Sequence, residues 1–196
     1  GKICVQTVVN VQGVAFIAAF TAINRVDDFA MTPQQNIAHA TTTFMAQNRG
    51  AGNIRRMKQG FLSSVVIQLA YTTAVAVLVF FGARPIMQLF VSDGSVEVTD
   101  LGVSYLRLIA VMYVMPAATN TIQGFFRGLG DLKVTLISTI LNMSARFFSA
   151  WLMIHRMHGG FDRLAWANFF GWVAMLALQI PMITYRWRHC GKEGGK

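Results

Sequence analysis

Three charged side chains, Asp27, Asp28 and Arg146, lie within long apolar stretches of the sequence. A carboxylate in such a setting can bind and release a proton or a cation, and an arginine can bind an anionic group. Arg25 stands three residues before Asp28, so on a helix the two could instead form an ion pair at the outer end of an apolar segment. Two interpretations of the acidic pair therefore stay open: a cation or proton site, or an interfacial ion pair.

Arg146 lies in the fourth helical turn of the apolar segment over 134–154. At 1.5 Å per residue it is about 18 Å from the start of that segment. Its side chain could pair with a helix-terminal carbonyl or an acid, which is a structural role. It could equally bind an anionic group or tune a carboxylate, which is a functional role.

A stripe of polar residues extends the acidic pair along one helix face. The residues recur at spacings of 4, 7, 4 and 3, and they are Asn24, Asp28, Gln35, His39 and Thr42. A polar stripe on a membrane helix must face protein or water. It could form the wall of a substrate cavity, with His39 as a candidate proton carrier, or it could supply interhelical hydrogen bonds worth about 0.6 kcal/mol each. Asn120, Gln123 and Asn142 could line the same cavity.

The elements that must position these residues are membrane-spanning helices. The chain of 196 residues is 54% hydrophobic and only 13% charged, and its apolar residues are grouped in blocks long enough to cross a bilayer core of about 30 Å. We predict an all-α integral membrane protein, a bundle of six transmembrane helices over about 1–12, 15–48, 61–82, 98–122, 134–154 and 164–185, followed by a basic tail over 187–196. The stretch before Asn48 allows two divisions: a helix that ends at Asn24 before a loop, or a turn near Gly13 followed by one long helix bent at Pro33.

Charge asymmetry predicts the orientation. Alternate loops on one side collect ten basic and two acidic residues: Arg49, Arg55, Arg56, Lys58, Arg127, Lys133, Arg186, Arg188, Lys192 and Lys196 against Asp131 and Glu193. The other side collects four basic and six acidic residues. By the positive-inside rule, the first side and the C-terminus are cytoplasmic and the protein lies in the plasma membrane among its lipids. The net charge of +9 is thereby explained without a nucleic-acid partner.

No residue set favours catalysis or a resident cofactor. The four histidines have no nucleophile or carboxylate at motif spacing, and no phosphate-binding loop occurs. Cys4 and Cys190 lie at opposite ends of the chain and suggest neither a disulfide framework nor a zinc site. We expect a protein that is not an enzyme and holds no metal.

Two glycine-rich loops carry a family resemblance. Gln47-Asn48-Arg49-Gly50-Ala51-Gly52, with Arg55 or Arg56 shortly after, resembles the QN-x-GAG-x-x-x-R loop of multidrug and toxic compound extrusion (MATE) transporters. Arg127-Gly128-Leu129-Gly130-Asp131 resembles the RG-x-GD loop after the tenth helix of the same family. We expect both loops to form tight turns rather than binding sites, because glycine permits the turn and arginine meets phosphate headgroups.

The resemblance implies the C-terminal six-helix lobe of a two-lobe transporter, from late in helix seven through helix twelve. Such transporters enclose a central cavity and use a proton or sodium gradient to export small organic, often cationic, compounds. The resemblance also implies the second division above, with Arg25, Asp27 and Asp28 near the outer end of a long helix. The other lobe would be an N-terminal segment missing from this chain or a second subunit, and a truncated first helix makes a fragment the simplest expectation.

The departures from the family pattern are informative. Pro116 stands where the sodium-coupled branch has an acidic residue, and the family's helix-seven carboxylate would precede Gly1. The chain therefore resembles more closely the DinF-like branch, whose principal proton site is in the other lobe. Two alternatives remain: a flippase for lipid-linked precursors, whose cavity should be rich in arginine, and a membrane subunit that does not transport.

Overall fold

The computed structural model describes residues 14–90, 96–156 and 162–189, and these residues form six helices. The helices are α2 (Val14–Gly50), α3 (Ile54–Phe90), α4 (Val96–Met112), α5 (Val114–Gly128), α6 (Leu132–Arg156) and α7 (Asp162–His189). No strand occurs in these three ranges. The predicted all-α fold is confirmed, and the helix predicted over 1–12 lies outside the described residues.

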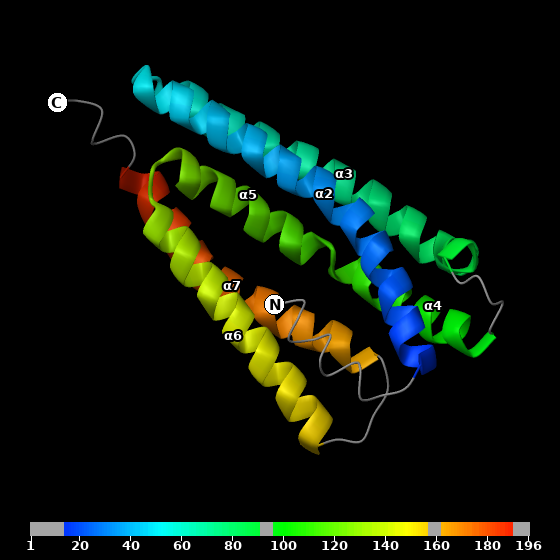
Figure 1. Cartoon of the computed structure of the whole chain (residues 1–196). Coiled ribbons are helices and arrows are strands. Elements are labelled where there is room, and N and C mark those ends of the chain that lie inside the picture. Colours follow the sequence, from blue (N-terminus) through cyan, green and yellow to red (C-terminus); the bar gives the residue numbers. More distant parts are fainter. Residues whose placement is uncertain (1–13, 91–95, 157–161, 190–196) are drawn as a thin grey trace.

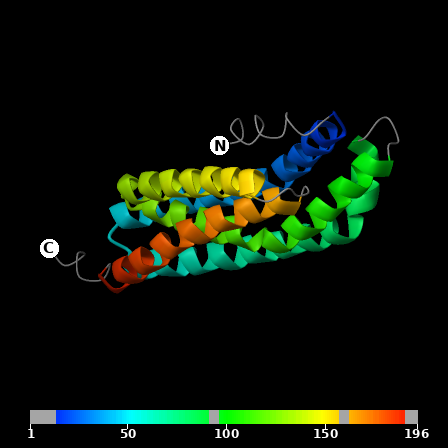
Figure 2. The same ribbon diagram turned by 90° about the horizontal axis from the view of Figure 1, so that it is seen from below.

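The helices are arranged as one bundle. α2 packs against both α3 and α5, α3 packs against α4, and α6 packs against α7 as an antiparallel pair (Figure 1). The turn from α2 to α3, the turn from α5 to α6 and the end of α7 all lie at the same end of the bundle, and the view from below agrees (Figure 2). The predicted basic loops are therefore gathered at a single end.

α2 is a single helix of 37 residues although Pro33 lies inside it. Proline has no backbone N–H, so this helix lacks one of its regular bonds. Just before the proline, the Thr32 hydroxyl donates to the Asp28 carbonyl at 2.6 Å, a bond that often accompanies bending. Asp27 and Asp28 thus lie within a helix rather than in a loop.

The segment predicted as one span over 98–122 consists of two helices, α4 and α5, bent by 45° relative to each other. Pro116 explains the break, because it cannot donate to the Met112 carbonyl one turn earlier. The bonds that remain around the break are long: Tyr113 N to Ala110 O and Ala117 N to Tyr113 O both measure 3.3 Å. The break therefore centres on Tyr113.

Two other predicted boundaries differ from the structure. Arg84, expected in an acidic loop, lies inside α3, because that helix continues through Pro85 to Phe90. It pairs with Asp100 of α4 at 2.5 Å, and both side chains are more than half exposed. The first residues of the tail predicted over 187–196 are helical, because α7 continues to His189.

Exposed apolar faces fit a lipid environment. Within the described residues, Ile54–Leu89 and Ala165–Arg188 are each long and apolar enough to cross a membrane, and α4 with α5 qualifies when the bent pair is taken together. Large apolar side chains are exposed along these helices, among them Phe81 at 77% and Leu89 at 84%. Exposure on this scale is unusual for a soluble monomer and normal where lipid covers the surface. The chain is an integral membrane protein.

A pair of glycines brings α5 close to α2. A Cβ at Gly124 would lie 2.7 Å from the Ala38 carbonyl oxygen, and a Cβ at Gly128 would lie 2.3 Å from the Met45 Cβ. Small residues four positions apart are a common means of close helix approach in membranes. The contact fixes α5 against α2 and thereby places the earlier part of α5 opposite the polar stripe.

Candidate functional site

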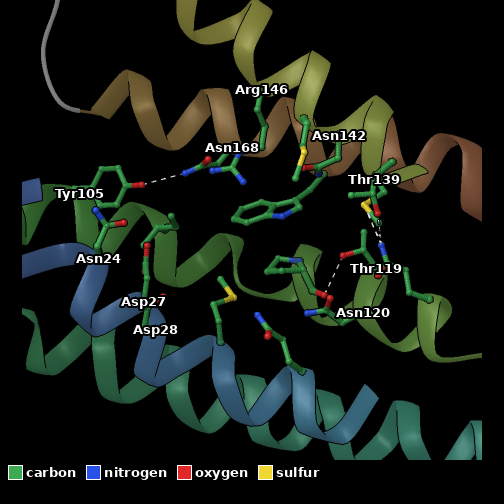
Figure 3. Close-up of a pocket in the computed structure, with 18 of the residues that line it drawn as sticks. Asn24, Asp27, Asp28, Tyr105, Thr119, Asn120, Thr139, Asn142, Arg146 and Asn168 are labelled. Carbon is green, nitrogen blue, oxygen red and sulfur yellow. Dashed lines mark hydrogen bonds between the residues drawn. The ribbon is translucent and has the colours of Figure 1, made fainter. Parts of the chain in front are cut away.

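A cavity of about 390 Å³ lies among α2, α4, α5, α6 and α7 (Figure 3). Its polar lining consists of carboxylates, amides, hydroxyls and an arginine: Asn24, Asp27, Asp28, Gln35, Tyr105, Thr119, Asn120, Gln123, Thr139, Asn142, Arg146 and Asn168. Its remaining lining is apolar or aromatic: Phe20, Met31, Ile109, Pro116, Met143, Trp172 and Met175. This mixture and this volume are typical of sites for small organic ligands.

Six of the seven residues predicted for a substrate or cation pathway line this cavity, namely Asn24, Asp27, Asp28, Gln35, Asn120 and Arg146. Gln123 and Asn142 line it as well. His39 does not, and its side chain is exposed further along α2. The structure brings these residues together, and their roles in transport stay predictions.

Asp27 has the more enclosed position of the two acidic residues. Its Oδ1 accepts a hydrogen bond from the hydroxyl of Tyr113 at 2.7 Å, whereas Asp28 is exposed. Tyr113 is fully buried and sits at the break between α4 and α5. The carboxylate is therefore bonded directly to the point where the bent pair changes direction.

Four polar residues of the cavity were not predicted from the sequence: Tyr105, Thr119, Thr139 and Asn168. Asn168 of α7 donates from Nδ2 to the hydroxyl of Tyr105 of α4 at 3.1 Å, across the cavity wall. Tyr105 is almost completely buried. The available signal was the position of Asn168 as an uncharged polar residue within an otherwise apolar segment, which in a membrane helix must face protein or water.

Arg146 reaches the cavity from α6 by passing over Gly171 of α7. A Cβ at Gly171 would lie 2.2 Å from Cγ and 2.9 Å from Cδ of Arg146, so only glycine leaves room for this path. Nε of Arg146 is buried without a hydrogen-bond partner in the described part of the chain. Tyr105 and Asp27 are close enough to interact electrostatically with the guanidinium.

Three of the lining residues join neighbouring helices. Nε2 of Gln123 on α5 lies 3.4 Å from Oγ1 of Thr139 on α6 and 3.9 Å from Sδ of Met175 on α7. Across residues 14–90, 96–156 and 162–189, no three His, Cys, Asp or Glu side chains form a group that could hold a metal ion. The charged groups of the lining, two carboxylates and a guanidinium, suit a proton, a monovalent cation or a small organic ion.

Comparison with known proteins assigns the fold to a family. Residues 2–152, most of the chain, match the sequence model of the MatE family. The chain belongs to the MatE family. Similar curated proteins include the probable multidrug resistance protein YpnP of Bacillus subtilis, 24% identical over 78% of this MatE chain and 35% of the relative. The FAD transporter of Shewanella oneidensis is 25% identical over 65% of this chain and 28% of the relative.

Solved structures share the MatE fold. A MOP superfamily transporter from Pyrococcus furiosus superimposes with a TM-score of 0.87 at 20% identity, over 96% of this chain and 42% of that chain. A multidrug resistance MATE family transporter in its outward-facing conformation gives a TM-score of 0.82 at 21% identity, over 91% and 40%. This chain spans less than half the length of each of these proteins. Its fold therefore corresponds to one lobe of a two-lobe MatE transporter.

The two predicted MatE loops form tight turns at one end of the bundle. Gly52 and Gly130 have φ values of +68° and +72°, a backbone region that favours glycine. Backbone bonds from Ala51 to Gln47 at 3.0 Å and from Leu129 to Phe125 at 3.0 Å close the preceding helix ends.

Side-chain bonds tie the loops together. Arg49 donates to the Leu129 carbonyl, and Arg186 of α7 pairs with Asp131 at 2.6 Å. Asn48 Nδ2 donates back to the Phe44 carbonyl at 2.8 Å. Three residues of the predicted motifs remain. Gly50 has open space around it, and Gly128 packs on α2. Nε of Arg127 donates to the Gln123 carbonyl. None of these loop residues lines the cavity.

Proposed function

We propose that this chain is one lobe of a MATE efflux transporter of the plasma membrane, which exports small organic compounds in exchange for H⁺ or Na⁺ and performs no enzymatic reaction. The observation that carries the proposal is the polar cavity inside a membrane-embedded bundle, with Asp27 and Asp28 on its wall. Ionisable groups within a membrane protein usually mark a substrate or ion pathway. The C-terminus and the basic turns would face the cytoplasm.

Asp27 is the strongest candidate for the coupling group. Its bond with Tyr113 joins the carboxylate to the α4–α5 break, so binding of a proton or a sodium ion at Asp27 would change the partner that holds this break. A cation that binds one conformation better than another shifts the equilibrium between them. Coupling by this route would need no cofactor besides the transported ion.

A complete transport path needs a second lobe. The relatives are more than twice as long as the part that this chain matches, and the second lobe would be an N-terminal segment or a second subunit. The lobes would rock about the cavity and expose it to each side in turn. We further propose that the protein belongs to the DinF-like branch, because Pro116 stands where the sodium-coupled branch has an acidic residue.

The rival functions have weaker support. A flippase for lipid-linked pyrophosphates should line its cavity with several arginines, and Arg146 is the arginine that the cavity offers in the described residues. A subunit without transport activity would not need a polar cavity, because unused polar groups in a membrane are costly.

The test is gradient-driven efflux in membrane vesicles from cells that express the chain with any adjoining segment its gene encodes. Asp27→Asn keeps the size of the side chain and removes its charge. We expect it to abolish efflux of ethidium while membrane levels of the protein stay unchanged. Asp100→Asn is the matched control, because Asp100 pairs with Arg84 outside the cavity. Efflux by Asp27→Asn at the rate of the control would reject Asp27 as the coupling group.

A further inference from the structure

The cavity is charged asymmetrically. Asp27 and Asp28 come from α2 on one wall, and Arg146 comes from α6 on the opposite wall (Figure 3). Amide side chains and the indole of Trp172 also line the cavity. A ligand that fills this space would therefore meet acidic groups at one side and a cationic group at the other.

The path of Arg146 indicates that its guanidinium is directed into the cavity. Its aliphatic part crosses α7 where Gly171 leaves room, and its Nε is buried with no partner in the described part of the chain. A guanidinium stays charged and offers five N–H donors in a planar fork that matches a carboxylate or a phosphate. An anionic group bound in the cavity would accept from this fork in charge-assisted hydrogen bonds, which are stronger than bonds between neutral groups.

Neighbouring side chains complete a subsite for an anionic group. Asn142 lies one helical turn before Arg146 on α6, and Asn168 lies one turn before Gly171 on α7. Both line the cavity, and the amide of Asn168 uses one N–H for Tyr105 and retains a second. Trp172 adds an aromatic surface for the apolar body of a ligand.

We propose that this cavity binds zwitterionic organic molecules, with an anionic group, a carboxylate or phosphate, at Arg146 and a cationic group toward Asp27 and Asp28. The proposal rests on the proposed transport function and adds to it a preference, among small organic substrates, for molecules that carry both charges. A volume of about 390 Å³ accommodates a small zwitterion.

Rhodamine 110 and rhodamine 123 test the proposal directly, because rhodamine 123 is the methyl ester of rhodamine 110 and differs only at the carboxylate. Their binding to the purified protein, which includes any adjoining segment that its gene encodes, is measured in lipid nanodiscs by fluorescence anisotropy, with empty nanodiscs subtracted. A charge-assisted hydrogen bond that one dye lacks predicts about tenfold tighter binding of rhodamine 110. In Arg146→Gln the two dyes should bind about equally.

Three further variants separate ligand binding from folding. Arg107→Gln makes the same change at an exposed arginine of α4 that does not line the cavity, and it should keep the wild-type preference. Gly171→Ala leaves the arginine in place but obstructs its path, and it should reduce the preference. Arg146→Lys keeps a charge without the fork and should retain part of the preference.

Equal binding of both dyes by the wild type, absence of binding, or an unchanged preference in a folded Arg146→Gln would each overturn the proposal. Efflux of rhodamine 110 and of rhodamine 123 is measured in parallel in the vesicles described above. Gradient-driven efflux without any preference for rhodamine 110 would overturn the zwitterion proposal and leave the transport function standing. Absence of efflux of either dye would count against the transport function itself.

Discussion

Replacing Gly128 with alanine is expected to force α5 away from α2. The new Cβ would lie 2.3 Å from the Met45 Cβ and 2.8 Å from the Thr42 carbonyl oxygen. Ordinary contacts of a Cβ begin near 3.4 Å, so the first of these is more than 1 Å too short. Neither neighbouring atom is at the end of a flexible side chain, and the helices must therefore separate.

The cost follows from the rigidity of this contact. Overpacking of a well-packed helix contact typically costs about 1–3 kcal/mol, and here the strain falls on the backbone of α2. We expect the free energy of unfolding in detergent to fall by about 2 kcal/mol. Separation of α5 from α2 also moves Asn120 relative to Gln35, so dye binding in the cavity should weaken.

Gly50→Ala is the matched control for this measurement. Gly50 is the last residue of α2. A Cβ added there would have nothing within 4 Å, and the residue does not have a positive φ. It should therefore unfold at the wild-type temperature or slightly above it. Equal stability of Gly128→Ala and Gly50→Ala would refute the claim that Gly128 sets the distance between α2 and α5.

Two further substitutions test buried polar groups. Tyr113→Phe removes the donor to Asp27 and is expected to slow gradient-driven efflux about tenfold, equivalent to about 1.4 kcal/mol, at an unchanged level of protein in the membrane. Efflux from vesicles at the wild-type rate would show that this bond has no part in coupling. Gln68→Met replaces an almost fully buried amide whose two polar atoms have no partner in the described residues, so it is expected to leave the free energy of unfolding unchanged or raise it by up to about 1 kcal/mol, measured as the thermal midpoint. Gln68→Ala leaves a void and should lower the midpoint. A lower midpoint for the methionine variant as well would mean that the amide is bonded.

The sequence was most informative about the membrane helices and the turns that join them. Uncharged blocks predict the spans because lipid offers no partners for polar groups. The glycine turns were predictable from residue type, since Gly52 and Gly130 adopt the backbone conformation that other residues avoid. The end of α3 was not, because Pro85 and Arg84 indicate a loop locally while packing against α4 continues the helix.

The candidate site was predictable in part. Helical spacing placed Asn24, Asp28 and Gln35 on one face of α2, and the cavity uses that face. The same spacing included His39, which lies beyond the cavity, because periodicity does not reveal where neighbouring helices leave a space. Contacts between distant residues were beyond reach for the same reason. The bond from Tyr113 to Asp27 joins positions 86 residues apart, and the passage of Arg146 over Gly171 depends on how α6 packs on α7.

Access to the cavity from both sides of the membrane tests the central claim most directly. Asn120→Cys places a thiol on the cavity wall of α5, in a background where Cys4 and Cys190 are replaced by alanine. Labelling with a membrane-impermeant methanethiosulfonate reagent is measured in right-side-out and inside-out vesicles, with and without an imposed pH or sodium gradient. A transporter lobe predicts labelling from both sides, with a gradient shifting the ratio of the two rates. Labelling from one side only, at a rate that no gradient changes, would contradict alternating access and favour a membrane subunit that does not transport.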